Sequence, residues 1–316
     1  MNRPYVPQPI LDAAHDRSAA RAAQEWTRAD ELRDEIEAGG WRVIDSGTDF
    51  RLEPAVPADR VDSGRLLFGH SLAVPSRLDE PSTAPASVVV LLPHPGTPFE
   101  ARTLDGLVAA SPPGIHHVVV AEAPTPELSA ALEAFAGAVE VVGTSTRIGA
   151  AALRNIGIRR ATGEIVVLVD GLIDLLGDIV SPLIDALADP TVAVAGVDGL
   201  STVDFSAFTP TGAGDAATAI GGPIIAFRRA DAHAVGPIDE AFHTSELADT
   251  WWSLMLREGE AGSQVREAVV LPDLPIILRG SAVSGELVDR EARAVRRERY
   301  RLLRRFAGHE DLLAGG

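Results

Sequence analysis

The sequence contains no cysteine, and its basic side chains, histidine apart, are all arginine. Without cysteine the chain can form neither a disulfide, nor a thiolate metal site, nor a cysteine nucleophile, which fits a reducing cytoplasm. A lysine-free composition rich in arginine and alanine is typical of a high-GC bacterial gene.

Long apolar runs are also absent. The most apolar stretch, residues 165–176, is interrupted by Asp170 and Asp174, so no segment of 18 apolar residues could form a transmembrane helix. The first residues lack the basic, then apolar, then small pattern of a secretory signal peptide. We therefore expect a cytoplasmic protein.

An excess of positive charge is missing as well. The formal net charge of -17 excludes a general nucleic-acid binder, because neutralising phosphates requires a positive face. No glycine-rich phosphate loop of the G-x-G-x-x-G or Walker type occurs. What remains is an ordinary globular composition, 46% hydrophobic and 23% charged, in a 316-residue chain that can hold one large or two small domains.

Residues 1–53 predict a small domain of their own. An alanine-rich segment, 11–24, and a second segment, 29–38, are expected to form two helices. Two short alternating segments, 41–44 and 49–52, follow around a Ser-Gly-Thr turn and predict a β-hairpin.

This domain resembles the small C-terminal segment of cysteinyl-tRNA synthetases, which lies near the tRNA anticodon. Acidic residues outnumber arginines between residues 11 and 53, so we expect this helical hairpin to contact a protein partner; an adaptor that contacts RNA is the alternative. The matching residues are Ala20, Arg21, Ala23, Trp26, Ala29, Asp30, Leu32, Arg33, Asp34, Glu35, Ile36 and Asp45.

A proline-rich segment, residues 54–85, is expected to be a linker with a short packed piece at Leu66, Leu67 and Phe68. Between residues 86 and 285 buried β-branched runs alternate with helical segments, which predicts an α/β domain of three layers around a mostly parallel sheet. Residues 286–316 form a C-terminal amphipathic arginine-rich helix and tail. That helix either packs on the acidic body or makes peripheral contact with an anionic membrane or a partner.

The stretch of residues 149–174 organises the α/β domain. Residues 150–161 read as a helix that ends at Thr162-Gly163, and the apolar run 165–169 reads as a strand buried on both faces. The strand ends on Asp170, a carboxylate at the edge where open α/β sheets bind ligands. The alternative is that Asp170 caps the next turn.

The same stretch resembles family 2 glycosyltransferases of the GT-A fold, which carry a G-x-a-x-a-R-N-x-G-i-x-x-A-x-G-e segment before an acidic cluster. Residues 221–229 and 235–242 resemble two later motifs of that family in the same order, so the resemblance covers residues 86–282. The chain departs from the family at the acidic cluster, where Asp170 is followed by Gly171 and Leu172. The matching residues are Gly149, Arg154, Asn155, Gly157, Ile158, Ala161, Gly163, Glu164 and Asp170.

The resemblance implies transfer of a sugar from a nucleotide-sugar donor to an acceptor that it does not specify, with inversion. Such a transfer needs charge compensation for the departing diphosphate and a base for the acceptor hydroxyl. Asp249 aligns with the family's base, while Ala248 replaces the usual glutamate; the alternative role of Asp249 is the N-cap of a helix over 250–258. The resemblance places Asp239, Glu240 and Trp251 on the acceptor side, and it places Pro93, Glu122, Arg154, Asp170 and Arg279 around the donor.

A divalent metal, Mn²⁺ or Mg²⁺, is the family's usual counter-charge. Only Asp170 and Asp174 could ligate it here, and one or two carboxylates predict weak binding. Arg279 stands near the position of the family's metal-contacting histidine and could stabilise a diphosphate without metal.

Two further interpretations stay open. The missing carboxylates at positions 121, 171, 172 and 248 favour a catalytically degenerate relative that binds a nucleotide, a sugar or a protein without transfer. The other, a third interpretation beside the enzyme and the degenerate relative, is an adaptor that works through the synthetase-like N-terminal hairpin. The retained Asp170, Asp249, Asp239 and Glu240 favour the enzyme.

Overall fold

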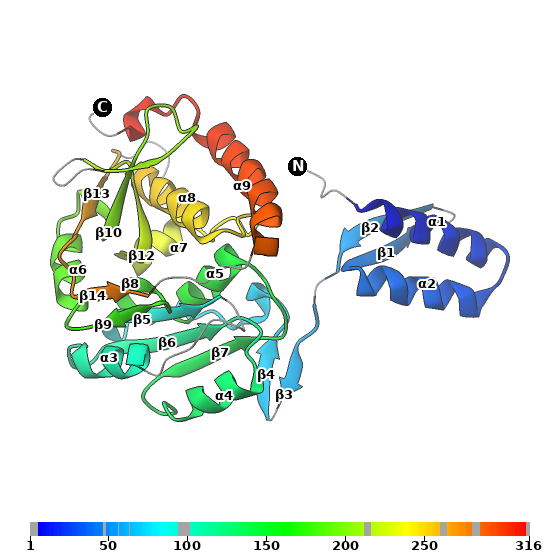
Figure 1. The fold of residues 1–316 in the computed structure, drawn as a ribbon, viewed down its shortest axis with the longest axis horizontal. Helices are drawn as coiled ribbons and strands as arrows, with labels where there is room; N and C mark the ends of the chain where they lie inside the picture. The colour runs from blue at the N-terminus through cyan, green and yellow to red at the C-terminus, as the bar shows by residue number, and fades with distance from the viewer. Residues whose placement is uncertain are drawn as a thin grey trace. The chain divides into compact units, whose positions relative to one another are not determined.

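A computed structural model describes residues 6–46, 49–55, 57–62, 64–93, 102–211, 216–259, 264–279 and 285–313. The chain divides into two compact units, Met1–Ala58 and Asp59–Gly316. Figure 1 shows the elements of each unit. None of the helices in the described ranges is long and apolar enough to cross a lipid bilayer.

The first unit is a helix pair packed on a β-hairpin, as predicted. Helices α1 (Gln8–Ala22) and α2 (Trp26–Ala38) precede β1 (Trp41–Ser46), which pairs antiparallel with β2 (Asp49–Pro54). The unit has its own core of apolar side chains. That core contains Ile10, Ala13, Ala14, Leu32, Ile36, Trp41 and Val43.

The second unit is built on one ten-stranded mixed sheet. Five neighbouring strands, in the order β8-β5-β6-β7-β4, run parallel, while β12, β11 and β3 join through antiparallel pairs. The predicted mostly parallel sheet is therefore parallel in its centre and antiparallel toward its edges. The strands are β3 (Arg60–Asp62), β4 (Arg65–Phe68), β5 (Ala84–Leu92), β6 (His116–Ala121), β7 (Glu140–Thr144), β8 (Gly163–Asp170), β10 (Val192–Ser201), β11 (Thr209–Pro210), β12 (Ala219–Arg228) and β13 (Glu267–Val270).

Helices cover both faces of this sheet, which confirms the predicted three-layer α/β fold. Along β5, Val88 and Val90 belong to one apolar cluster and Val89 and Leu91 to the other, because successive side chains of a strand point to opposite faces. The first face carries α3 (Arg102–Ala110), α4 (Pro126–Glu133) and α6 (Val180–Leu187). The second carries α5 (Ala150–Arg160), α7 (Arg229–Val235), α8 (Ser245–Glu258) and α9 (Gly285–Phe306).

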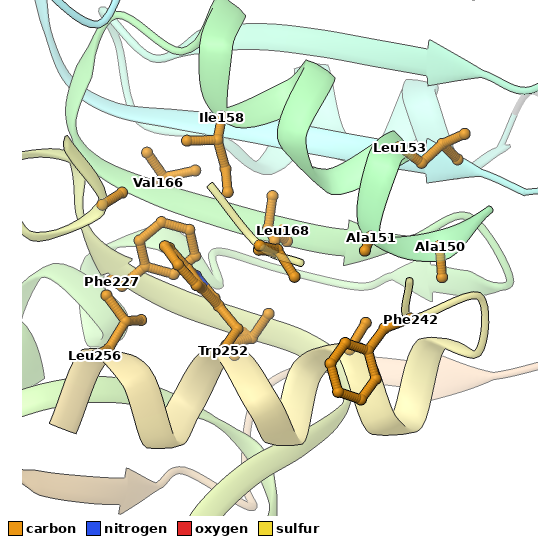
Figure 2. Close-up of a cluster of buried hydrophobic side chains, with 14 of the residues drawn as sticks. Ala150, Ala151, Leu153, Ile158, Val166, Leu168, Phe227, Phe242, Trp252 and Leu256 are labelled. Atoms are coloured by element: carbon orange, nitrogen blue, oxygen red, sulfur yellow. The ribbon is translucent and has the colours of Figure 1, made fainter. Parts of the chain in front are cut away.

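The second face is the aromatic one. Figure 2 shows side chains of α5, β8, β12 and α8 meeting there. Trp252 of α8 lies edge-on to Phe227 of β12, with ring centroids 5.5 Å apart. This core holds α5 and α8 side by side, and both helices contribute to the candidate site.

The segment predicted as a proline-rich linker contributes strands to the sheet. Within it, β3 and β4 form a hairpin, and β4 pairs with β7, with Leu67 opposite Gly143. Leu67 is buried, so a short apolar strand outweighs the surrounding prolines. A two-stranded sheet of β9 (Ile173–Leu175) and β14 (Ile276–Leu278) was likewise not predicted, because its strands are very short.

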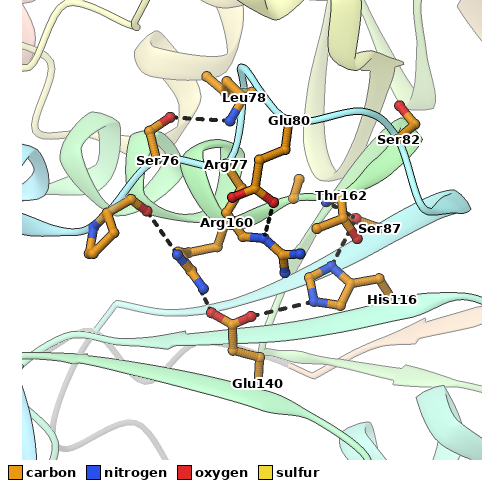
Figure 3. A network of polar contacts seen from close by, with 12 residues as sticks. Ser76, Arg77, Leu78, Glu80, Ser82, Ser87, His116, Glu140, Arg160 and Thr162 are labelled. Carbon is orange, nitrogen blue, oxygen red and sulfur yellow. Dashed lines mark hydrogen bonds and ion pairs between the residues drawn. The ribbon is translucent and has the colours of Figure 1, made fainter.

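A polar network closes the amino-terminal edge of the parallel strands (Figure 3). The hydroxyl of Ser87 accepts hydrogen bonds from the amides of Thr162 and Gly163 and lies 3.1 Å from Nδ1 of His116. On the other side of that ring, Glu140 is 3.5 Å from His116 and 2.5 Å from Arg160. Burial favours the neutral carboxyl, but His116 and Arg160 outweigh it and lower the pKa of Glu140 to about 2.

Candidate functional site

The candidate site lies at the carboxyl-terminal edge of three adjacent parallel strands. Asp170 ends β8, Pro93 follows β5 and Glu122 follows β6; Asp170 is opposite Leu91, and the Glu122 amide donates to the Leu92 carbonyl. Loops at this edge of an α/β sheet are the usual place for a ligand. The residues after Pro93, 94–101, lie outside the described residues.

A pocket at this edge brings together four of the residues selected from the sequence. Pro93, Arg154, Asp170 and Asp249 come from four different elements and share its wall. Sequence reasoning did not select the remaining lining residues, although Gly221-Gly222-Pro223 in the first half of β12 was a visible signal. These remaining residues are Leu91, Leu153, Leu168, Gly222, Pro223, Ile225 and Ser245.

Arg154 and Asp249 form a buried, bidentate ion pair across the pocket. Nε of Arg154 donates to one carboxylate oxygen of Asp249 at 2.6 Å, and a terminal nitrogen donates to the other at 2.7 Å. The side chains are 8% and 2% exposed. Burial raises the pKa of Asp249, and the guanidinium of Arg154 opposes that rise. Both oxygens of the predicted base are thus held by the predicted donor-binding arginine.

Asp249 is not the N-cap that the sequence suggested as its alternative role. Helix α8 begins at Ser245, so Asp249 lies inside it, and Thr244 occupies the cap position. Glu298 of α9 instead holds the two residues just before the helix: it accepts hydrogen bonds from the amide of His243 at 3.0 Å and from the hydroxyl of Thr244 at 2.6 Å. A carboxylate there also lies near the positive end of the α8 dipole.

Glu298 was missed by sequence reasoning, although its position carried a signal. It follows Val295 by three residues and precedes Leu302 by four, so it falls on the apolar face of α9. The neighbouring Arg299 is exposed, whereas Glu298 is only 3% exposed. A lone acid on an apolar helical stripe marks a buried polar contact.

Asp170 fits both roles considered for it. It lines the pocket, and one of its oxygens accepts a hydrogen bond from the Leu172 amide at 2.9 Å, which fixes the following turn. The neighbouring Gly171 has no room for a side chain, because a Cβ there would lie 2.9 Å from the Leu91 carbonyl oxygen. The close approach of this turn to β5 explains why no second carboxylate follows Asp170 directly.

Asp174 and Arg279 pair with each other beside the turn after Asp170. Nε of Arg279 is 3.3 Å from Asp174, and a terminal nitrogen donates to the hydroxyl of Thr103 and to the carbonyl of Gly171. Neither residue is among those that line the pocket. This arginine therefore braces the turn that carries Asp170.

The side chains that the structure describes around the pocket do not by themselves form a site for a divalent metal. Asp174 is engaged by Arg279, which leaves Asp170 as the one carboxylate of the pocket that is not paired with an arginine in the described contacts. Among the described residues no group of three histidine or carboxylate side chains is placed to hold an ion. Hard cations need several oxygen ligands, so any metal here would depend on ligands from a substrate.

Glu122 supports the pocket from outside it. The side chain is 3% exposed, and one oxygen accepts hydrogen bonds from the amides of Ile148 and Gly149, both at 2.8 Å. Gly149, the N-cap of α5, has φ of +91°, a conformation that favours glycine. Glu122 thereby fixes the start of the helix that carries Arg154.

The three residues predicted on the acceptor side lie outside the pocket lining as well. Asp239 pairs with Arg301 at 2.7 Å, and Glu240 accepts a hydrogen bond from Asn155 at 2.9 Å. Trp251 packs between Phe242 and Phe306, with centroids 4.9 and 5.3 Å away. These contacts tie the turn before α8 to α5 and α9, so the three residues position α8.

Comparisons with known proteins give matches in structure alone. No protein-family profile matches the sequence, and no curated protein matches it. A crystal structure of GalNAc-T7 with UDP, GalNAc and Mn²⁺ matches 67% of this chain and 48% of its own, with 14% identity and a TM-score of 0.52. The chain thus spans about half the length of that protein.

Two further structures are similar at lower scores. The mannosyltransferase PcManGT from Pyrobaculum calidifontis, in complex with GDP-Man and Mn²⁺, matches 74% of this chain and 72% of its own, with 20% identity and a TM-score of 0.48. TarS of S. aureus with UDP matches 67% and 64%, with 17% identity and a TM-score of 0.47. The GalNAc-T7 match, together with the strand order, shows that this chain has a GT-A-like fold.

Proposed function

We propose that the chain is a glycosyltransferase that moves a sugar from a nucleotide-sugar donor to an acceptor hydroxyl with inversion. The observation that carries this proposal is the single pocket in which Pro93, Arg154, Asp170 and Asp249 meet at the carboxyl edge of the parallel strands. The GT-A-like fold supports it as an analogy, since fold alone does not specify chemistry.

In this proposal the donor diphosphate lies between Asp170 and Arg154. The acceptor oxygen attacks the anomeric carbon, the bond from that carbon to the diphosphate breaks, and Asp249 takes the acceptor proton. Arg154 compensates the charge that develops on the diphosphate. A phosphate that draws the guanidinium toward itself also frees the oxygens of Asp249, so donor binding would expose the base.

The other predicted residues act indirectly in this scheme. Arg279 and Glu122 brace the turn after Asp170 and the start of α5, while Asp239, Glu240 and Trp251 hold the beginning of α8. The negative charge on the diphosphate is then compensated mainly by the arginine side chain and not by a metal ion. A Mn²⁺ or Mg²⁺ ion would be held chiefly by the donor's phosphates, with Asp170 as the protein ligand.

A second candidate is a protein that binds a nucleotide or sugar without transferring it. It is favoured by the closed Arg154–Asp249 pair, because a base with both oxygens engaged and 1% exposure is blocked until the arginine moves. A third candidate is an adaptor that binds a protein partner through the N-terminal unit. Trp26 of that unit is 59% exposed and offers a contact surface.

Asp249→Asn tests the enzyme. Turnover of UDP- and GDP-sugars should fall by about 10²–10⁴-fold, because the proton acceptor is lost, while binding of UDP or GDP by calorimetry changes little. The substitution leaves Arg154 without its full partner, so rates are normalised to the folded fraction from circular dichroism. The matched control is Asp231→Asn, which breaks an ion pair with Arg266 outside the pocket and should leave turnover unchanged.

The outcomes separate the candidates. Nucleotide binding by the wild-type chain without hydrolysis or transfer, across a broad panel of donors and acceptors, would establish the binding protein. Loss of turnover in both variants would mean that general destabilisation, and not the base, was measured. A wild-type chain that binds no nucleotide and transfers no sugar would rule out both the first and the second candidate.

A further inference from the structure

The outer face of α9 carries a concentration of positive charge on an acidic protein. Arg296, Arg297, Arg299, Tyr300 and Arg304 are exposed, and Tyr300 is exposed to 67%. The whole chain has a formal net charge of -17. We call these five residues the basic face of α9.

The inner side of the same helix is firmly attached to the body. Leu302 and Phe306 are buried in the core, and Glu298 accepts hydrogen bonds from His243 and Thr244, just before α8. Two more arginines are used for this attachment: Arg301 pairs with Asp239, and Arg305 pairs with Glu258. Figure 1 shows α9 beside α8, which its last turns contact. The basic face is therefore displayed on a fixed helix and does not depend on folding upon binding.

We propose that the basic face of α9 docks on the surface of an anionic lipid membrane. The charge is complementary to anionic headgroups, and each arginine near such a surface contributes about 1 kcal/mol, a roughly fivefold change in partition. Tyr300 lies among the arginines, and tyrosine is enriched at the headgroup level of membranes. A 22-residue helix is about 33 Å long, which suits a flat surface that touches one side of the protein.

A nucleic acid fits this face less well. A polyanion that extends beyond the helix would meet an acidic body, and the repulsion would oppose binding. Membrane docking does not depend on the proposed sugar transfer. If both hold, docking would place the acceptor side of α8 near a membrane, because Glu298 and Arg301 join α9 to the turn before α8.

Flotation of the full chain with vesicles tests the proposal. Vesicles of phosphatidylcholine with phosphatidylglycerol should bind the protein in a salt-sensitive manner, and pure phosphatidylcholine vesicles should not. A variant with Arg296→Gln, Arg297→Gln, Arg299→Gln and Arg304→Gln should partition about 600-fold less. The matched control, Arg28→Gln, Arg33→Gln, Arg42→Gln and Arg51→Gln, removes the same charge from exposed positions of the first unit and should bind like the wild type.

A site-specific probe keeps the test valid if the quadruple variant fails to fold. Because the chain has no cysteine, Tyr300→Cys can be labelled at one position with an environment-sensitive fluorophore. Its emission should shift to the blue on anionic vesicles, while the same label at Leu72→Cys, a position 68% exposed, should not respond. No vesicle binding, equal loss in both arginine variants, a response at position 72 alone, or a gel shift with RNA without vesicle binding would each overturn the proposal.

Discussion

The pocket combines a buried ion pair with a single carboxylate that is only half-buried. Arg154 and Asp249 satisfy each other across α5 and α8, so removal of either leaves the other buried and unpaired, at a cost of about 3–5 kcal/mol. Asp170 is in no such ion pair among the described contacts. One of its oxygens accepts a hydrogen bond that fixes the next turn, and the side chain still lines the pocket. At this scale Asp170 is the group best able to respond to a ligand.

Adding a carboxylate beside Asp170 should create metal dependence. Leu172 is half-buried and follows the tight Gly171, so Leu172→Asp offers a second acidic side chain two residues along without filling the space against β5. Two carboxylates with a diphosphate hold a hard cation better than one. We expect Mn²⁺ to strengthen UDP or GDP binding by about tenfold in this variant and little in the wild type, as measured by calorimetry.

Gly171→Asp is the matched comparison. It adds the same charge one residue earlier, where a Cβ would meet the Leu91 carbonyl, so it should destabilise the fold without any gain in metal response. If Leu172→Asp and wild type respond identically to Mn²⁺ while both bind nucleotide, Asp170 does not face the diphosphate.

Residues that line the pocket were easier to predict than residues that hold its elements in place. Arg154, Asp170 and Asp249 stand at motif positions and share one pocket. The contacts of Glu298 with the segment before α8 and of Glu122 with the start of α5 join segments far apart in the sequence, which no local pattern encodes. Asp249 shows the same limit, because its helix begins at Ser245, five residues earlier than the sequence indicated.

Among the elements, the amino-terminal ends of β6 and β7 are joined to α5 by charge. Glu140 on β7 bridges His116 on β6 and Arg160 on α5, opposite the edge that carries the pocket. This arrangement leaves the carboxyl edge open for a ligand and concentrates a pH-sensitive contact at the other edge.

Glu140 should make the fold sensitive to acid. Its pKa is lowered from 4.5 to about 2, so its stabilising contribution is fully present above pH 4.5 and is lost as the pH falls toward 2. Glu140→Gln should therefore lower the free energy of unfolding by about 1–2 kcal/mol at pH 7, after allowance for partial exposure, and by much less near pH 2. Urea unfolding followed by circular dichroism between pH 2 and 7 measures the difference.

Glu133→Gln provides the comparison for this pH dependence. Glu133 is a 57% exposed partner of Arg65 at 3.5 Å, and such a surface pair contributes little. The pH profile of that variant should follow the wild type. A Glu140→Gln profile parallel to the wild type down to pH 2 would contradict the low pKa of Glu140.

The centres of the main strands and helices could be read from the sequence, and short or edge elements could not. The β-branched runs of β5 and β8 are buried on both faces and leave a continuous apolar pattern. Strands β4, β9 and β14 span three or four residues each, too few for a period to be visible. Proline in the surrounding segment then led to a linker being predicted where β3 and β4 extend the sheet.

At the scale of the whole molecule, the sequence indicated two bodies of different character. The first has its own small core, and the second distributes its apolar side chains over the two faces of one sheet. Residues 59–85 are also joined to the second body by hydrogen bonds: the Arg77 amide donates to the Arg159 carbonyl, and the Arg229 guanidinium donates to the Glu80 carbonyl. We propose the functional boundary at residue 58, the edge of the first compact unit.

Two truncated chains test this boundary. A fragment of residues 59–316 should keep the nucleotide affinity and the melting temperature of the second unit, because it retains β3, β4 and the bonds to Arg159 and Arg229. A fragment of residues 86–316 loses them, uncovers the edge of β7 and removes the partner strand that Leu67 supplies, so it should melt several degrees lower or aggregate. The first unit, residues 1–58, is small but has a packed core and should unfold cooperatively by itself. Differential scanning calorimetry of the three fragments and the full chain measures all of these melting temperatures.

Equal stability of the 59–316 and 86–316 fragments would show that residues 54–85 are a linker after all. Limited proteolysis that cuts first between residues 59 and 85 would lead to the same conclusion.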